Sequence, residues 1–313
     1  MEMNDNKKFI ITIDTEADNQ WDISHKCTTE NAKYLFRFQE LAEKYNFKPV
    51  YLTTYEMAND DLFVEYFRKK QNENLCEIGM HLHAWNTPPE YKLESKTKER
   101  SYLLEYPIDI MEKKIENLDL LLTDKFVIKP VSHRSGRWAI NNEYLNLLKK
   151  YGYKIDCSVT PNINWKNSLG ETGIPGSDYR KCPKKPYMIN DGILEVPMTI
   201  RKIHIFRKNK VESLKGFIKE FGHFVLGKKQ WVRPDKTFTK EEIIKLIDNC
   251  NKNNEYIMFM IHSSELMPGG SPNFITNSDI EKLYSLIEQI FMYIYSLGYT
   301  GTTLRDYYSG RYR

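Results

Sequence analysis

Short apolar segments alternate along the chain with longer segments whose apolar residues recur every three or four positions. The first short segment, Phe9–Ile13, is apolar at consecutive positions, which is typical of a strand buried on both faces. Segments of this kind predict strands at Phe9–Ile13, Val50–Thr53, Leu75–His81, Phe126–Val131, Tyr153–Cys157, Ile193–Met198, Tyr256–His262 and Tyr299–Leu304. The helical spacing predicts helices at Ala32–Tyr45, Asp61–Lys69, Pro107–Leu122, Asn142–Tyr151, Glu241–Cys250 and Asp279–Ser296.

This order of elements predicts an α/β fold. Strand and helix alternate six or seven times, which implies a parallel sheet and, most simply, a βα barrel. No composition shift marks a domain boundary, so we expect one domain over 1–313. Two insertions interrupt the alternation: an irregular stretch after strand five (160–190), rich in Trp, Pro and Gly, and a second one at 200–236.

Composition excludes several classes of protein. The 313 residues are 41% hydrophobic and 13% aromatic, as in a globular protein with a large core. A net charge of +4 is small for this length, and we expect no nucleic-acid partner. The five cysteines are scattered without a CxxC pair, and neither a signal peptide nor a bilayer-spanning segment is visible. We therefore expect reduced thiols and a cytoplasmic location.

Ionisable residues follow almost every predicted strand. The βα loops of a parallel barrel open at the C-terminal strand ends, where catalytic groups gather. Unpaired ionisable groups near a core are costly, so packing alone explains such a series poorly. The residues at these strand ends are Asp14 and Glu16, His81 and His83, His133 and Arg134, Asp156, and His262.

Two of these pairs predict a metal site. His81 and His83 are spaced i, i+2 at a strand end, so both imidazoles face one side of the sheet. Asp14 and Glu16 have the same spacing. Mixed oxygen and nitrogen ligands suit Zn²⁺ or another borderline divalent ion, with Co, Ni, Fe or Mn as alternatives. The other interpretation is that these residues cap strands or pack beneath loops.

The remaining groups suit proton transfer. Asp14 can act as a general base, and the guanidinium of Arg134 can clamp its carboxylate and hold its pKa down. His262 can donate a proton to a leaving group. The alternatives are a surface ion pair for Arg134 and a hydrogen-bonded core position for His262.

Four motifs spread over Lys8–Asp306 resemble those of the polysaccharide deacetylase family, the carbohydrate esterases with a chitooligosaccharide-deacetylase homology domain. Here they read Thr12–Glu16, Glu77–His83, His133–Trp138 and Phe259–His262. The chain looks like a divergent cytoplasmic branch of that family.

The resemblance implies a distorted (β/α)7-type barrel that removes N- or O-acetyl groups from sugars with the help of a metal. Asp14 falls on the family's base and His262 on its general acid. Arg134 falls on the arginine that positions the base. Glu16 falls near the metal carboxylate and His81 on the first metal histidine.

The motifs also depart from the family pattern. The usual Asp-Asp pair is Asp14-Thr15, which leaves the metal carboxylate to Glu16. Trp85 stands where the second histidine is usual, so His83 is the expected substitute. The family's Asp followed by Trp is reduced to Asp156-Cys157-Ser158.

We therefore predict a metal-dependent carbohydrate deacetylase acting on an acetylated sugar, a nucleotide sugar or a lipid-linked glycan. Trp85, Trp138 and Asp156 are the expected substrate-binding residues. The alternative is a catalytically inactive barrel of this kind that binds a glycan or glycolipid. A glycoside hydrolase fits less well, because Asp14 and Glu16 on one strand cannot flank a scissile bond.

The insertion at 200–236 has its own charge pattern. It holds eleven basic and three acidic side chains, a net formal charge of +8, interleaved with apolar residues. This combination suits peripheral contact with an anionic membrane or a phosphate-bearing substrate. The alternative is a solvated helical insert over the barrel.

Overall fold

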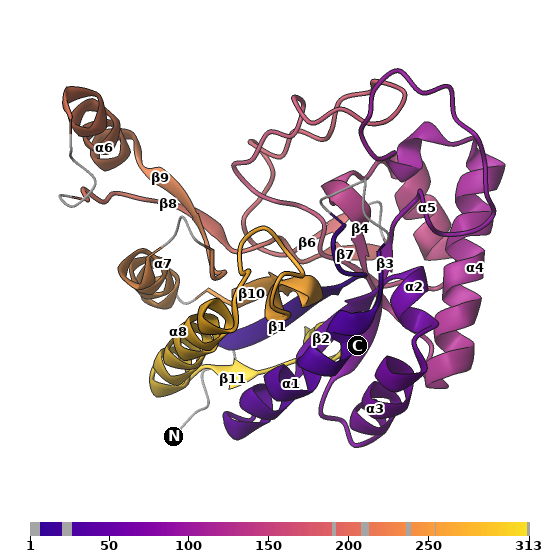
Figure 1. Cartoon of the computed structure of the whole chain (residues 1–313), viewed down its shortest axis with the longest axis horizontal. Helices are drawn as coiled ribbons and strands as arrows, with labels where there is room; N and C mark the ends of the chain where they lie inside the picture. Colours follow the sequence, from indigo (N-terminus) through magenta and orange to yellow (C-terminus); the bar gives the residue numbers. More distant parts are fainter. Residues whose placement is uncertain are drawn as a thin grey trace.

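The computed structural model describes residues 7–20, 27–189, 192–207, 213–235, 239–253 and 255–311. A curled, mostly parallel sheet lies at its centre (Figure 1), in the order β10-β1-β2-β3-β4-β5-β7-β6. The short strand β11 pairs with the N-terminal end of β1, on the edge opposite β10. The strands are β1 (Lys8–Thr15), β2 (Pro49–Thr53), β3 (Glu77–Leu82), β4 (Ser132–Ser135), β5 (Ile155–Asp156), β6 (Tyr187–Ile189), β7 (Ile193–Glu195), β10 (Ile257–His262) and β11 (Thr300–Gly301). The predicted distorted βα barrel is confirmed.

Helices surround the sheet, and several of them start at side-chain caps. Asp60 caps α3 by accepting a hydrogen bond from the Phe63 amide, and Thr239 and Thr276 form capping boxes at α7 and α8. The helices of the barrel are α1 (Leu35–Lys44), α2 (Tyr55–Ala58), α3 (Asp61–Asn72), α4 (Ile108–Phe126), α5 (Asn142–Lys150), α7 (Lys240–Lys252), α8 (Asn277–Ser296) and α9 (Leu304–Arg311). Short 3-10 helices lie at Glu30–Tyr34, Leu103–Glu105, Gly136–Trp138 and Ser263–Leu266.

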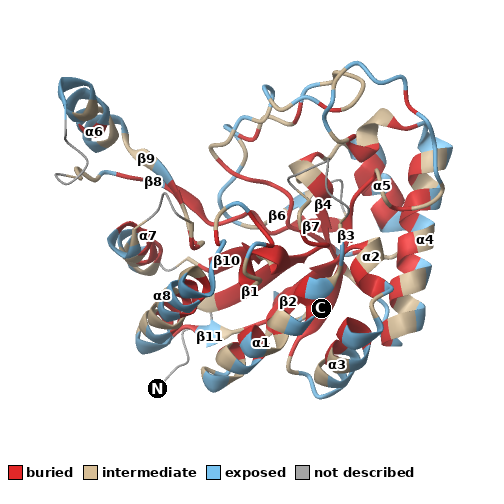
Figure 2. Ribbon diagram, viewed as in Figure 1, coloured by how far each residue is buried: buried red, intermediate tan, exposed pale blue. Residues whose placement is uncertain are grey.

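Strand residues alternate between two apolar clusters. Phe9, Ile11 and Ile13 of β1 pack with the surrounding helices, whereas Ile10 packs inside the curl with residues of the other strands. The sheet is accordingly buried on both sides (Figure 2). Side chains at the even positions of β1 therefore point into the barrel, and the last of these is Asp14.

The curl is completed by irregular segments beside β10. The Met258 amide donates to Thr199 Oγ1 (2.9 Å), and the Met260 amide donates to the Val232 carbonyl (3.2 Å). These bonds occupy the edge of β10 that faces away from β1. The barrel is distorted because loop backbone takes the place of a strand there.

One predicted strand was wrong in position and another in length. The segment Phe126–Val131 is not a strand, because α4 continues through Phe126 and ends at Val127, which has a left-handed backbone (φ 65°) and an exposed side chain. β4 begins only at Ser132. The strand predicted at Tyr299–Leu304 is limited to two residues of β11, since Leu304 begins α9.

The two insertions differ in structure. Between 160 and 186 the chain has no helix or regular strand and is held by isolated bridges such as Asn164–Asp178. The second insertion contains an antiparallel pair, β8 (Ile200–Ile203) and β9 (Lys228–Trp231), and helix α6 (Leu214–Leu226). We call its described residues, 200–207 and 213–231, the arm; α6 lies at its far end (Figure 1). Residues 208–212 and 236 of the predicted insertion lie outside the described ranges.

Within the described ranges, no helix has both the length and the apolar character that crossing a bilayer requires.

Candidate active site

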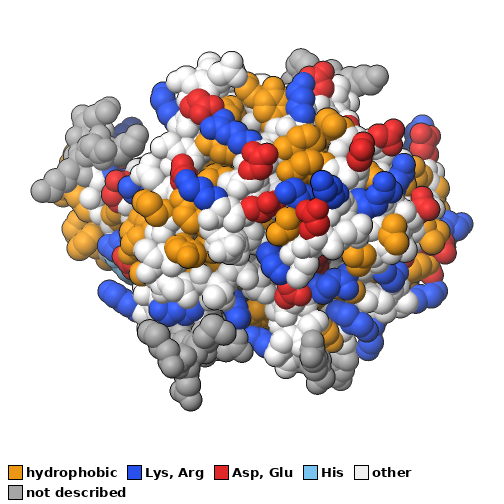
Figure 3. Space-filling view, turned by 90° about the horizontal axis from the view of Figure 1, so that it is seen from below, with side chains coloured by type: hydrophobic (Ala, Val, Ile, Leu, Met, Phe, Trp, Pro, Cys, Tyr) orange, Lys and Arg blue, Asp and Glu red, His pale blue; other side chains and the backbone are white. Residues whose placement is uncertain are grey.

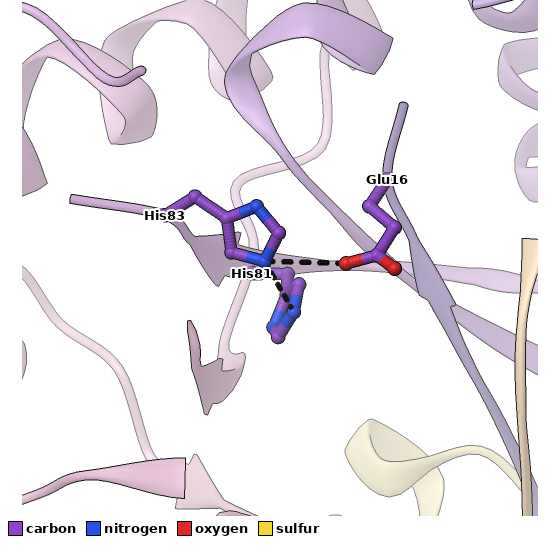
Figure 4. A group of neighbouring side chains, drawn as sticks. All are labelled: Glu16, His81 and His83. Atoms are coloured by element: carbon purple, nitrogen blue, oxygen red, sulfur yellow. Dashed lines mark hydrogen bonds and ion pairs between the residues drawn. The ribbon is translucent and has the colours of Figure 1, made fainter. Parts of the chain in front are cut away.

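Three of the predicted metal ligands meet at the C-terminal end of the barrel strands. Glu16 follows β1, His81 lies in β3 and His83 follows it; Figure 4 shows their side chains converging. Nε2 of His83 lies 3.3 Å from Oε2 of Glu16 and 3.1 Å from Nε2 of His81. One ligand atom from each residue lies within 4.8 Å of the others, and all three residues are buried.

Strand alternation explains this convergence. Ile78, Met80 and Leu82 of β3 belong to the cluster under the helices, so the intervening side chains face the barrel interior. A neighbouring glycine then leaves room for His83. A Cβ on Gly136 would lie 2.8 Å from Cδ2 of His83 and 2.6 Å from the Leu82 carbonyl oxygen.

The backbone fixes the tautomer of His81. Its Nδ1 lies 2.9 Å from the carbonyl oxygen of Arg134, to which it donates a hydrogen bond. Neutral His81 thus directs the lone pair of Nε2 at Glu16 and His83, which is the arrangement of a metal-ligating imidazole. His83 is placed differently: its ring stacks on Trp85 with the centroids 4.3 Å apart, and its Nδ1 is buried without a hydrogen-bond partner among the described residues.

Burial sets the charge of these ligands. It lowers the pKa of His81 and that of His83 to about 4, so both rings are neutral at pH 7 and able to ligate. Burial also raises the pKa of Glu16 to about 7. The positive charge of nearby His262 only partly offsets this burial, and a divalent cation would place further positive charge directly beside the carboxylate. The three residues therefore fit such a cation, with Zn²⁺ first among those that prefer nitrogen and carboxylate ligands.

Asp14 and Arg134 form a buried ion pair beside the ligands. A guanidinium nitrogen of Arg134 donates to Oδ1 of Asp14, another donates to Thr12 Oγ1 (3.0 Å), and Nε donates to the Cys157 carbonyl (3.2 Å). Burial opposes ionisation of Asp14, but the positive charge and hydrogen bond of Arg134, together with the nearby histidines, outweigh burial and lower the pKa of the carboxyl. Asp14 is thus held as a carboxylate in a fixed orientation.

Arg134 binds one carboxylate oxygen of Asp14, and His262 lies near the other. Its Nε2 lies 3.8 Å from Oδ2 of Asp14, and its Nδ1 lies 3.1 Å from Oε2 of Glu265. Arg233 in turn binds Glu265 at 2.8 Å. Burial disfavours the imidazolium, but the negative charges of Glu16 and Glu265 outweigh burial and raise the pKa of His262. The ring is set up to carry a proton.

The sequence interpretation missed Glu265 and Arg233. Glu265 follows His262 by three residues and accepts from its backbone amide (3.0 Å), so the spacing of a capping box could have identified it. No local pattern identifies Arg233, because it arrives from the base of the arm.

A cavity of about 320 Å³ opens above these groups. Trp85 and Trp138, both predicted to bind substrate, line it, and Lys98, Arg100 and Arg137 add positive charge at its walls. Arg134 lies under the Trp138 ring, 5.1 Å from its centroid. The cavity therefore combines aromatic faces, cations and the candidate catalytic groups.

Asp156, also predicted to bind substrate, lies outside the cavity lining. It is fully buried, and its carboxylate pairs with Nδ1 of His133 (2.6 Å) and accepts from the Ser158 hydroxyl (2.8 Å). His133 continues this chain of bonds to the Tyr144 hydroxyl (2.7 Å). Among the described residues Asp156 is not part of the cavity lining, and the geometry gives it a role in orienting β4 and β5.

No protein-family model matches the chain, and no curated protein sequence matches it. Several solved structures match the chain in fold. One, described as a polysaccharide deacetylase of Mycobacterium smegmatis, is 13% identical, with 95% of this chain and 94% of that chain covered and a TM-score of 0.47. The Xyl-CE4 domain of a multidomain xylanase from the hindgut metagenome of Trinervitermes trinervoides is 10% identical, with 97% and 91% covered and a TM-score of 0.47.

This chain is similar to both of these structures in overall fold. It is similar as well to a GH57 branching enzyme of Thermococcus kodakaraensis, at 11% identity, with 98% and 72% covered and a TM-score of 0.51. Because a branching enzyme shares the architecture, the likeness shows the fold and leaves the reaction to be argued from the site.

Proposed function

We propose that the protein is a metal-dependent hydrolase that removes an N- or O-acetyl group from a sugar. One observation carries the proposal: a buried Glu16-His81-His83 group and Asp14, which is paired with Arg134, line the same cavity. Metal ligands next to an oriented carboxylate are the parts that hydrolysis by an activated water requires.

The chain's own residues divide the work as follows. Glu16, His81 and His83 would hold a divalent cation, which when bound supplies Lewis-acid polarisation and a more acidic water. Asp14 accepts the proton of the attacking water at Oδ2, since Oδ1 is engaged by Arg134. His262, whose protonated form is favoured by its contact with Glu265, gives its Nε2 proton to the departing sugar nitrogen or oxygen.

The cavity walls favour particular substrates. Trp85 and Trp138 offer aromatic faces on which a pyranose ring can pack. Lys98 and Arg100 add cations that suit a phosphate, as carried by a nucleotide sugar or a lipid-linked glycan. Asp156 stays a predicted substrate contact only if a rearrangement exposes it. The predicted cytoplasmic location favours such precursors over a finished cell wall.

The test of the proposal is acetate release from acetylated sugars and nucleotide sugars by the whole chain. Activity is expected after loading with Zn²⁺, or with Co²⁺, Ni²⁺, Fe²⁺ or Mn²⁺, and is expected to disappear with a chelator and return when the metal is restored. Full activity after verified removal of all metal would overturn the mechanism.

Glu265 provides a further prediction as a positioning residue. In Glu265→Gln the negative charge beside Nδ1 is lost, so the pKa of His262 falls and the proton donor loses its proton at lower pH. The high-pH limb of the kcat profile is therefore expected to move to lower pH, which a pH series on metal-loaded enzyme measures.

A matched control is Glu255→Gln, which removes the carboxylate of another largely buried Arg–Glu pair, that with Arg201 (2.6 Å), away from the cavity. Its pH limb should coincide with that of the wild type. If both variants gave the wild-type limb, Glu265 would have no part in holding the proton on His262.

The alternative function is glycan binding without hydrolysis, which the departures from the family pattern favour. Thr15 has no carboxylate to offer the site, and its hydroxyl donates to the Ile13 carbonyl (3.1 Å). Saccharide affinity in a protein with neither bound metal nor acetate release would support this alternative. A retaining or inverting glycosidase finds less support, since Asp14 and Glu16 lie on the same strand end.

A further inference from the structure

Helix α6 at the end of the arm is amphipathic, but its apolar side faces solvent. The apolar residues recur at helical spacing and are between 45% and 76% exposed. They are Leu214, Phe217, Ile218, Phe221, Phe224 and Val225. A helix that packs on a protein core turns such a stripe inward (compare α6 with α7 in Figure 2), so this one is oriented for a partner outside the chain.

Polar bonds fix this orientation. The only fully buried side chain of α6 is that of Glu220, which pairs with Arg207 (2.6 Å) and lies 3.5 Å from Nδ1 of His223. His204, next to β8, makes a hydrogen bond to the Phe224 carbonyl (2.9 Å). The inner side of α6 is thus held to the arm by charge, and its apolar stripe is left outermost.

The charge of the arm selects among possible partners. Lys215 and Lys219 are exposed on α6, and the sequence 200–236 carries +8 whereas the remainder of the chain carries −4. On the face of the molecule seen in Figure 3, by contrast, basic and acidic side chains are interspersed. A second copy of the arm would bring like charges together, while an anionic surface attracts them.

We propose that the arm docks on the surface of an anionic lipid bilayer. Phe217, Phe221 and Phe224 enter the boundary between headgroups and acyl chains, and Lys215 and Lys219 lie among the phosphates. An apolar stripe flanked by lysines on a helix too short to span a bilayer is the composition of an interfacial helix.

The base of the arm connects this surface to the candidate active site. Trp231 at the end of β9 packs edge-on against Trp138 of the cavity, with ring centroids 5.8 Å apart. Arg233, two residues later, binds Glu265, the partner of His262. Docking would therefore tether the cavity to the bilayer through the arm. If the proposed hydrolysis is correct, a sugar attached to a membrane lipid is the substrate class that this placement serves.

Co-sedimentation of the whole chain with vesicles tests the docking without reference to catalysis. We expect binding to vesicles of phosphatidylcholine and phosphatidylglycerol in equal amounts, weak binding to phosphatidylcholine alone, and weaker binding as salt is raised. Lys215→Glu with Lys219→Glu should lower the partition coefficient at least about tenfold, and Phe217→Ser, Phe221→Ser and Phe224→Ser together by about a hundredfold or more.

The matched control replaces three exposed apolar residues of the barrel: Leu62→Ser, Leu120→Ser and Met292→Ser. It should bind vesicles like the wild type. No binding by the wild type, or equal loss in control and α6 variants, would overturn the proposal. So would a dimer in light scattering that the phenylalanine variants dissociate while vesicle binding is absent, because α6 would then cover a second copy. Acetate release from a soluble substrate is measured separately, so a failed docking and a failed hydrolase are distinguishable.

Discussion

Replacing Asp14 by asparagine is expected to lower kcat for acetyl hydrolysis by about a thousandfold. The amide cannot accept the proton that the carboxylate takes from water, while its oxygen still accepts the hydrogen bond from Arg134. Bound metal should stay in place, because Asp14 is not among the three clustered ligands. The measurements are single-substrate kinetics and metal content on the same preparation.

Stability must be followed in this variant because Arg134 is fully buried. Removing one partner of a buried ion pair outright costs about 3–5 kcal/mol, and the retained oxygen should keep the loss below that range. Asp119→Asn is the control, since it alters another buried carboxylate, bound to Lys129 (2.6 Å), away from the cavity. Wild-type activity in a folded, metal-loaded Asp14→Asn protein would refute the role of Asp14 as base.

Replacing either histidine of the cluster is expected to weaken metal binding by more than about 100-fold. Residues that merely orient a ligand account for 10- to about 100-fold in affinity, and His81 or His83 would be ligands themselves. His81→Gln and His83→Gln each place an amide where a buried imidazole stood, and acetate release should fall with the metal content. Competition with a chromogenic chelator measures the affinity.

A buried histidine outside the cluster separates this effect from general damage. His133→Gln removes an imidazole bonded to Asp156 and Tyr144, so stability should fall while metal affinity stays near that of the wild type. Equal metal affinity in all three variants would show that His81 and His83 do not hold the ion.

Much of the site could be predicted because strand geometry is simple. A buried strand sends alternate side chains to opposite faces, so the spacing of Asp14 and Glu16 and that of His81 and His83 determined which side they share. The parallel order then placed all four at one end of the barrel. The position of His83 beside His81 and Glu16 follows from the same alternation.

Other parts depended on contacts that no local pattern encodes. Asp156 ends its strand as predicted, but His133 and Ser158 bind its carboxylate in the interior. Glu265 lies close in sequence to His262, whereas Arg233 reaches it across the junction with the arm. Val127 is β-branched and reads as part of a strand, yet it ends α4 because the capping hydrogen bond to Thr123 outweighs its local preference.

The orientation of α6 on the arm likewise depends on a contact that no local sequence pattern encodes. The basic charge interleaved with apolar residues at 200–236 leaves two interpretations open, an anionic partner or a solvated helical insert. The ion pair between Glu220 and Arg207 of the arm determines which side of α6 faces the protein. That pairing turns the apolar stripe outward, and it is visible only in three dimensions.

The most direct test of the central claim is the metal content of the purified whole chain, measured by mass spectrometry beside the His81→Gln protein. We expect close to one divalent ion per chain in the wild type, Zn²⁺ first, and much less in the variant. A folded wild type that takes up no divalent ion from any of the tested salts, or an ion bound equally well after His81→Gln, would contradict it.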